Sequence, residues 1–134
     1  MADTFGTGDY RYELVEDWGQ WPMDGIASDV ATTSNGNVYV AVRTSYSGLY
    51  TREGDNSNTG VIVVFDKDGN FLSQWGEEYF ATPHGLWISP SDEIFHADSG
   101  NHTVTRFNPN GELLMSIGVK DELGPQGEPF RSPT

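Results

Sequence analysis

The sequence predicts an all-β chain built from two four-stranded blades of a β-propeller, and two internal repeats support this prediction. Residues 61–76 (VIVVFDKDGNFLSQWG) align with residues 103–118 (TVTRFNPNGELLMSIG). Upstream of these copies, residues 29–40 align with residues 85–96. A repeated unit of four short strands is typical of propeller blades. No segment shows sustained 3.6-residue periodicity, so almost no helix is expected.

The composition narrows the kinds of partner that the protein can have. The chain has 134 residues, a net charge of −13 and seven basic residues that form no cluster. Such a surface repels a phosphate backbone, so nucleic-acid binding is not expected. The absence of cysteine excludes disulfides and thiolate metal sites. No apolar run approaches the ~18 residues of a membrane span, and no signal peptide is visible. We therefore expect a soluble protein without a membrane partner and leave its compartment open.

The first 25 residues are expected to hold a flexible start and one strand. Residues 1–9 are small, polar and glycine-rich, which is typical of a loose terminus. Residues 10–25 begin with an aromatic-rich segment, 10–18, and continue into a loop. Because residues 10–18 resemble the last strand of a blade, we expect them to form an N-terminal closing strand that completes another blade of a ring.

Residues 26–76 are predicted to form the first blade. Asn35 and Gly36 suit the tight turn between its first two strands. The upstream repeats are shifted by 56 residues and the downstream repeats by 42, and the difference marks residues 44–60 as an insertion. The role of this insertion is left open. The expected strands are 26–33, 38–43, 61–65 and 71–75.

Residues 77–118 are predicted to form the second blade, and residues 119–134 a tail that leads to a missing third blade. With the N-terminal strand, the chain has one strand more than two blades need. Two blades cannot close a ring, so we expect the propeller to be completed by more chain or by oligomerisation. The expected strands of the second blade are 85–89, 93–98, 103–108 and 113–117.

Two residues are candidates for a site on the propeller axis. His84, between Pro83 and Gly85, opens the innermost strand of the second blade and would point into the central channel. Its imidazole is a natural ligand for zinc or a similar ion, although it could instead only hydrogen-bond a neighbouring loop. Arg43 ends the second strand of the first blade, where a guanidinium could clamp a carboxylate with two hydrogen bonds. The alternative is a surface arginine that pairs with an acidic side chain.

The remaining polar residues are interpreted as structural. His96 is expected to pack between blades, and His102 and Asp98 to stabilise a turn. Structural calcium is a candidate second cofactor, because the pairs Asp66/Asp68 and Asn108/Asn110 precede a glycine as in a calcium loop. These pairs lack the distal Glu and its spacing, which favours hairpin turns. No nucleophile elbow, phosphate-binding loop, HExxH motif or spaced carboxylate pair is present.

The blade pattern resembles the NHL-repeat propellers. A closer resemblance, to the N-terminal blades of peptidyl-α-hydroxyglycine α-amidating lyase-like proteins, covers residues 12–134. Its motifs occur here as YELVE, NVYVAVR, FATPHGL and PFRSPT, in that order. The Pro-His-Gly element is the most specific of these. The resemblance implies a six-bladed propeller in which three histidines on alternate blades hold zinc, an arginine binds the substrate carboxylate and a tyrosine acts as base.

On this resemblance, His84 matches the first zinc histidine and Arg43 the carboxylate-binding arginine. The other two zinc histidines and the catalytic tyrosine have no counterpart, and Tyr46 in the insertion is a candidate substitute for the tyrosine. The implied reaction cleaves a carbinolamide to an amide and glyoxylate. The chain is therefore expected to be a metal-dependent lyase acting on a small carboxylate-bearing substrate if a complete site forms. The remaining blades would be supplied by a longer chain or by a homo-oligomer such as a trimer. The alternative is a non-catalytic NHL-repeat binding or scaffold module.

Overall fold

The computed structural model describes residues 3–43, 60–125 and 130–134, and every regular element in this part of the chain is a strand. None of these residues lies in a helix long and apolar enough to cross a membrane. The predicted all-β fold is confirmed. The strands are β1 (Thr4–Thr7), β2 (Tyr10–Glu13), β3 (Ile26–Thr32), β4 (Val38–Arg43), β5 (Gly60–Phe65), β6 (Phe71–Trp75), β7 (Pro83–Ile88), β8 (Ile94–Asp98), β9 (Thr103–Phe107) and β10 (Leu113–Ile117).

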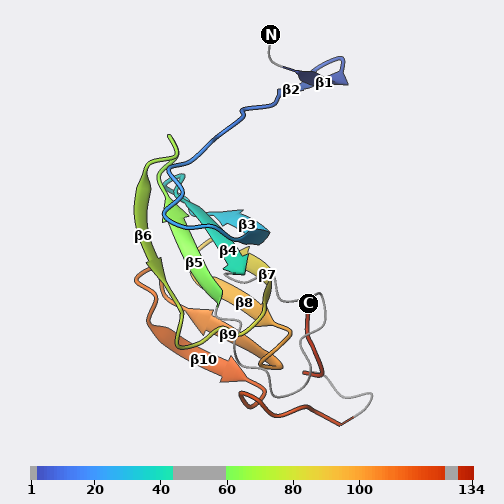
Figure 1. Ribbon diagram of the computed structural model, residues 1–134, viewed down its shortest axis with the longest axis vertical. Coiled ribbons are helices and arrows are strands. Elements are labelled where there is room, and N and C mark those ends of the chain that lie inside the picture. Colours follow the sequence, from blue (N-terminus) through green and yellow to red (C-terminus); the bar gives the residue numbers. More distant parts are fainter. Residues whose placement is uncertain (1–2, 44–59, 126–129) are drawn as a thin grey trace.

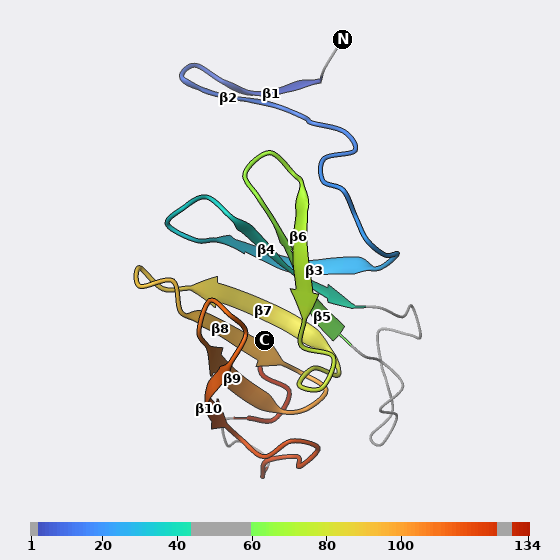
Figure 2. The same ribbon diagram turned by 90° about the vertical axis from the view of Figure 1, so that its left-hand side faces the viewer.

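Eight of the strands form two blades of four. The sheet orders are β3-β4-β5-β6 and β7-β8-β9-β10, and all neighbours are antiparallel. Each blade is therefore a simple meander, which agrees with the two predicted propeller blades. The two sheets pack face to face, with β3 beside β7 (Figures 1 and 2). We call the sheet that begins at β3 blade 1 and the sheet that begins at β7 blade 2.

The apolar core follows the two faces of blade 1. Strand β5 is fully buried because it lies inside the sheet and is covered on both sides. Alternate residues of β4 and β5 point to opposite faces, as the period of a strand requires. Those on one face pack between the blades, in a cluster of Tyr39, Ala41, Ile62, Val64, Phe80, Leu86, Ile88, Ile94 and Phe107. Those on the other face form a second cluster of Val40, Val42, Val61, Val63 and Phe65.

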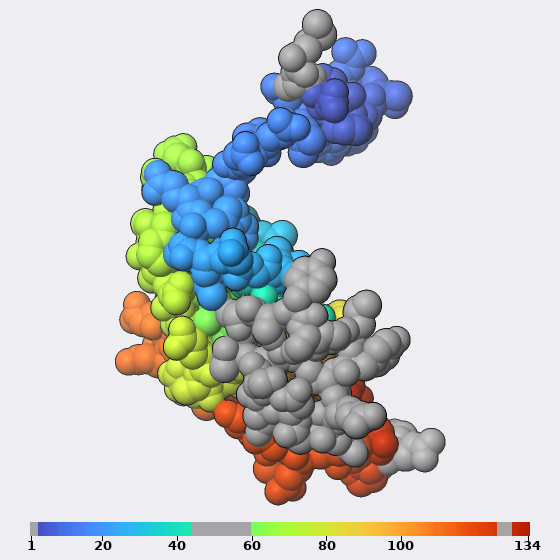
Figure 3. Space-filling model, in the orientation of Figure 1, coloured from blue at the N-terminus to red at the C-terminus, as the bar shows by residue number. Residues whose placement is uncertain are grey.

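Trp18, in the segment before β3, packs on the second cluster in the same way that Trp75, at the end of β6, packs on the first. The Trp18 ring lies 5.5 Å from Phe65, and the Trp75 ring lies 5.0 Å from Phe107. The glycine that follows each tryptophan has a positive φ, 91° at Gly19 and 103° at Gly76. Figure 3 shows this segment, in lighter blue, lying against blade 1. Residues 18–19 thus pack on blade 1 as the end of a preceding outer strand would.

Upstream of this contact, the structure differs from the sequence-based expectation. Residues 1–9 were expected to be loose and residues 10–18 to be one closing strand, but β1 and β2 pair with each other in a separate two-stranded sheet. The hairpin extends away from the blades (Figure 1). Two features explain the difference. Gly8, at φ 62°, allows the tight turn between β1 and β2, and Asp17, at φ 54°, breaks the extended conformation before Trp18.

The last described residues lie against blade 2 as residues 80–84 lie against blade 1. Phe130 lies beside Gly118, as Phe80 lies beside Gly76. The Ser132 amide donates a hydrogen bond of 3.1 Å to Nδ1 of His102. The tail thus repeats on blade 2 the contact that Phe80 makes beside Gly76.

Candidate axial site

His84 lies in a bulge at the start of the inner strand of blade 2. Pro83 pairs with Asp98 and Gly85 pairs with Ala97, so His84 has no partner of its own in the β7–β8 ladder. A bulge of this kind redirects a side chain and is frequent next to functional sites. The His84 side chain is half-buried. The local backbone therefore presents an imidazole that is neither packed in the core nor paired within its sheet.

Blade 1 has a bulge at the equivalent position, occupied by Ser28. Ala27 pairs with Val42 and Asp29 with Ala41, which leaves Ser28 outside the ladder. Its hydroxyl donates to the Ala41 carbonyl at 3.1 Å. Both blades thus have a bulge at this position. In blade 1 it carries Ser28, whose hydroxyl bonds its own sheet, and in blade 2 it carries the imidazole of His84.

Arg43 reaches across from blade 1 to the strand that carries His84. Its Nε donates a hydrogen bond of 2.8 Å to the carbonyl oxygen of Pro83. Within the described ranges, Arg43 forms no ion pair with a carboxylate. The structure therefore brings the two predicted site residues to the same end of the inner strands, although they are far apart in the sequence.

A third residue of this region, Asp29, was not anticipated from the sequence. Its Oδ2 accepts a hydrogen bond of 2.8 Å from the backbone N–H of Leu86, and its Oδ1 accepts one of 2.8 Å from the N–H of Val30. The available signal was the repeat alignment, in which Asp29 matches Gly85. Blade 2 has a glycine at this position of its inner strand. The carboxylate in blade 1 instead finds a hydrogen-bond donor, the Leu86 N–H, in the neighbouring blade.

No complete metal site is formed by these residues. Among residues 3–43, 60–125 and 130–134, no three His, Cys, Asp or Glu side chains are grouped so that they could hold a metal ion. His84 would supply one ligand, whereas a catalytic zinc usually has about three from protein. Tyr46, with residues 44–59 of the insertion, lies outside the described residues.

His96 is packed between the blades, as predicted. It is 1% exposed, and its ring lies 4.2 Å from the ring of Phe80. Neither ring nitrogen has a hydrogen-bond partner within the described part of the chain. Burial lowers the pKa of His96 to about 4, and the nearby Asp98 carboxylate offsets only part of this effect. The imidazole is therefore neutral at pH 7.

The prediction that Asp98 stabilises its turn is confirmed, whereas His102 accepts a hydrogen bond from Ser132 of the tail. The Asp98 carboxylate is buried and accepts hydrogen bonds from the N–H groups of Gly100 and Asn101 at 2.9 and 2.8 Å. It also accepts from Ala81 and Thr82, which precede β7. Asp98 therefore fixes both its own turn and the entry to the strand that carries His84.

The two acidic or amide pairs that resemble calcium loops are hairpin turns. Asp66 Oδ1 accepts from the N–H groups of Asp68 and Asn70 at 2.8 and 2.9 Å. The hydrogen bonds from Asn70 hold the pKa of the Asp66 carboxyl below its usual range. Asn108 makes the matching contacts in blade 2. These oxygens already serve their own turns, so the loops give no support to a calcium site.

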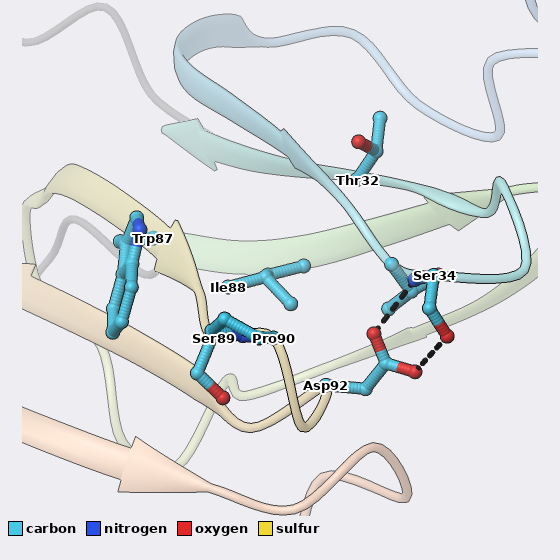
Figure 4. Close-up of a pocket in the computed structure, with 8 residues that line it drawn as sticks. Thr32, Ser34, Trp87, Ile88, Ser89, Pro90 and Asp92 are labelled. Atoms are coloured by element: carbon cyan, nitrogen blue, oxygen red, sulfur yellow. Dashed lines mark hydrogen bonds between the residues drawn. The ribbon is translucent and has the colours of Figure 1, made fainter.

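A separate hollow of about 300 Å³ lies at the other end of the inner strands (Figure 4). It is lined by the turns of the β3–β4 and β7–β8 hairpins. There, Asp92 accepts hydrogen bonds of 2.7 and 2.6 Å from the amide and hydroxyl of Ser34. Residues 85–88 of β7 lie between His84 and the turn that begins at Ser89, and these five residue steps of a strand correspond to roughly 16 Å. The hollow is therefore not part of the axial site.

Comparison with known proteins agrees with this architecture. No protein-family model matches the chain. NHL repeat-containing protein 3 of Mus musculus is 32% identical over 117 residues, which is 78% of this chain and 30% of that protein. The chain is related to the NHL-repeat propellers.

Amidating lyases match this NHL-type chain as well. Peptidyl-alpha-hydroxyglycine alpha-amidating lyase 1 of Drosophila melanogaster is 27% identical over 95 residues, covering 69% of this chain and 17% of the lyase. A probable lyase of the same description from Caenorhabditis elegans is 25% identical over 120 residues, covering 82% of this chain and 34% of the nematode protein. The NHL-type chain thus spans about a third or less of the length of these curated relatives.

Proposed function

We propose that this NHL-type chain contributes His84 and Arg43 to a zinc-dependent lyase site on the axis of a propeller. The observation that carries the proposal is the 2.8 Å hydrogen bond from Arg43 Nε to the Pro83 carbonyl. This bond holds the Arg43 side chain against Pro83, the residue that precedes the bulged His84. The amidating lyases among the relatives support this chemical class.

In the proposed site, Arg43 binds the carboxylate of a small substrate. Its Nε is committed to Pro83, which leaves the two terminal nitrogens as the remaining donors of the guanidinium. These two nitrogens form a planar pair that matches the two oxygens of a carboxylate. The proposed contact therefore uses the end of the guanidinium, while the Pro83 carbonyl fixes the direction in which the group points.

His84 supplies one nitrogen ligand of the proposed zinc ion. When bound, a zinc ion in such a site polarises an oxygen of the substrate or lowers the pKa of a bound water. The proposed substrate is an N-acyl-α-hydroxyglycine. Cleavage breaks the carbon–nitrogen bond, the hydroxyl loses its proton to give glyoxylate, and the departing nitrogen gains a proton to give an amide. The residues described here fit part of this site only, so no step through the metal is assigned to them.

The rest of the ring is supplied in one of two ways. Further blades of a longer chain would bring their own ligands. Alternatively, three copies of this chain would form six blades and place three His84 side chains around a threefold axis, with an Arg43 beside each. Closed cyclic assemblies of this type are common for protein chains.

The test is to measure the mass of the assembly by light scattering and to assay zinc and glyoxylate release on the same chromatographic peak. A trimer with one zinc per three chains, lost in His84→Ala, would support the copy-based site. His102→Asn is a matched control, because it removes a histidine from the same blade and asparagine tolerates the left-handed φ of 59° at that position. Zinc that is retained in His84→Ala, or a metal-free monomer without activity, would contradict the copy-based site.

A second candidate is a non-catalytic binding or scaffold module. The relative at 32% identity is described only as an NHL repeat-containing protein. The grouping of one histidine with one arginine in the described residues is also compatible with a ring that holds no metal. Partner binding that survives His84→Ala, together with absence of zinc, would favour this candidate.

A further inference from the structure

Two side chains of blade 1 hold the segment that carries His84, one on each side of it. Arg43 donates to the carbonyl of Pro83, the residue before His84. Asp29 accepts from the N–H of Leu86, two residues after it. Since β3 and β7 are the edge strands of their sheets, these bonds use backbone groups on the edges that face the neighbouring blade rather than groups in a ladder. The bulge at His84 is thus fixed from outside its own sheet.

Strand formation alone does not require a carboxylate at position 29. The equivalent position in blade 2 is Gly85, and both strands have their bulge immediately before this position. The carboxylate makes one bond within its own strand, to Val30, and one to the next blade, to Leu86. The bond to Leu86 therefore connects the bulge of blade 1 to the bulge of blade 2, a connection that the backbone of β3 does not make.

We infer that Asp29 is a positioning residue for His84. It acts through the Leu86 amide, which it holds at 2.8 Å, and so fixes the direction in which the bulge presents the imidazole. A charge-assisted hydrogen bond to a carboxylate is shorter and stronger than a neutral one, which suits this role. The inference rests on the proposed function only in taking His84 as the metal ligand. The restraint on the bulge is a property of this chain without any metal.

The test compares two substitutions at position 29 with one at Asp92, a carboxylate that bonds Ser34 of the neighbouring blade. Asp29→Gly copies the residue of blade 2 and removes both bonds. Asp29→Asn keeps the shape but replaces one acceptor oxygen with a donor. Asp92→Asn is the matched control, because it perturbs the junction between the blades at the end remote from His84. The readouts are the exchange rate of the Leu86 amide and the ring resonances of His84, both by NMR on the metal-free chain.

In Asp29→Gly, we expect the Leu86 amide to exchange at least 10-fold faster and the His84 ring resonances to shift. The amides of Ile62 and Ile94, in the buried core, should keep their rates. Asp29→Asn should give a smaller change in the same direction, and Asp92→Asn should leave both Leu86 and His84 unaffected. An unchanged Leu86 rate in Asp29→Gly would overturn the inference. So would a uniform acceleration of all amides, because it would mean that Asp29 only stabilises the junction.

A zinc titration separates this inference from the proposed function. If the wild-type assembly binds zinc, Asp29→Gly should weaken the affinity by 10–100-fold, the usual effect of losing a residue that orients a ligand. An equal affinity in the two proteins would contradict the positioning role. If the NMR changes occur and the wild-type protein binds no zinc, Asp29 still positions His84 and the proposed lyase function fails.

Discussion

Acidification should destabilise the protein through His96. The unfolded chain exposes this histidine with an ordinary pKa of 6.5, whereas burial between the blades lowers its pKa in the folded protein to about 4. Because the folded pKa is the lower one, the unfolded state takes up the proton first. The free energy of unfolding therefore falls as the pH drops below about 6.5, and the loss is complete below about 4.

The size of the effect follows from the two pKa values. Their gap corresponds to about 3 kcal/mol when fully developed, and about 2 kcal/mol of this is reached by pH 5. The carboxylates of this acidic chain also contribute to any acid transition, so the wild-type curve alone does not isolate His96. The difference between the wild type and His96→Leu does, because leucine fills a similar volume and carries no proton. At pH 7 this variant should be at least as stable as the wild type, since it also removes two ring nitrogens for which the described residues offer no partner.

The assay is urea unfolding followed by tryptophan fluorescence at pH values from 7.5 to 4.5. His96→Leu should lose less stability than the wild type on acidification, with the two curves diverging below pH 6.5. Parallel curves for the wild type and His96→Leu across this range would refute the reasoning, as would an NMR titration of the His96 ring with an ordinary pKa.

Four further substitutions test the packing between the blades, the strain at two glycines with positive φ, and one hydrogen bond. Trp75→Ala should cost about 3 kcal/mol of unfolding free energy in the same urea assay, because the indole covers Phe107 between the blades; a loss below about 1 kcal/mol would contradict this packing role. Gly76→Ala should cost about 3 kcal/mol, because φ is 103° and the added methyl would meet a phenyl ring. Gly8→Ala should cost only about 1 kcal/mol, because φ is 62° but the space beside it is open; equal losses would contradict the proposed clash. Ser34→Ala should raise the pKa of the Asp92 carboxyl towards its ordinary value, since the Ser34 hydroxyl and then its amide are the main causes of the lowered pKa; an unchanged carboxyl titration by NMR would show that this hydrogen bond is absent in solution.

The blades could be predicted from the sequence because their strands are marked by local features, apolar runs and turn residues, that occur twice in the chain. Strand β4 begins after the Asn35-Gly36 turn and ends at Arg43, where the apolar run 38–42 stops. The alignment of the two repeats then fixes β9 and β10 from β5 and β6. The N-terminal hairpin could not be predicted in this way. Residues 10–13 fit an outer strand equally well, and their pairing with β1 depends on a single glycine turn.

The candidate site was predictable in its residue types but not in its connections. The motif around His84 and the position of Arg43 identify two side chains, yet nothing in their spacing shows that Arg43 bonds the Pro83 carbonyl. That contact depends on the packing angle between the blades. Asp29 was missed for a related reason. Its partner, the Leu86 amide, is a backbone group of another sheet, and only the mismatch with Gly85 in the alignment hinted at a special role.

The central claim is that His84 is an axial zinc ligand in a completed propeller, and anomalous scattering at the zinc edge from crystals of the assembled protein tests it most directly. We predict a single zinc peak on the ring axis, about 2.1 Å from a ring nitrogen of His84, with Arg43 still bonded to the Pro83 carbonyl. A zinc peak elsewhere in the protein, or an ordered His84 with no peak beside it in crystals grown with zinc, would contradict the claim.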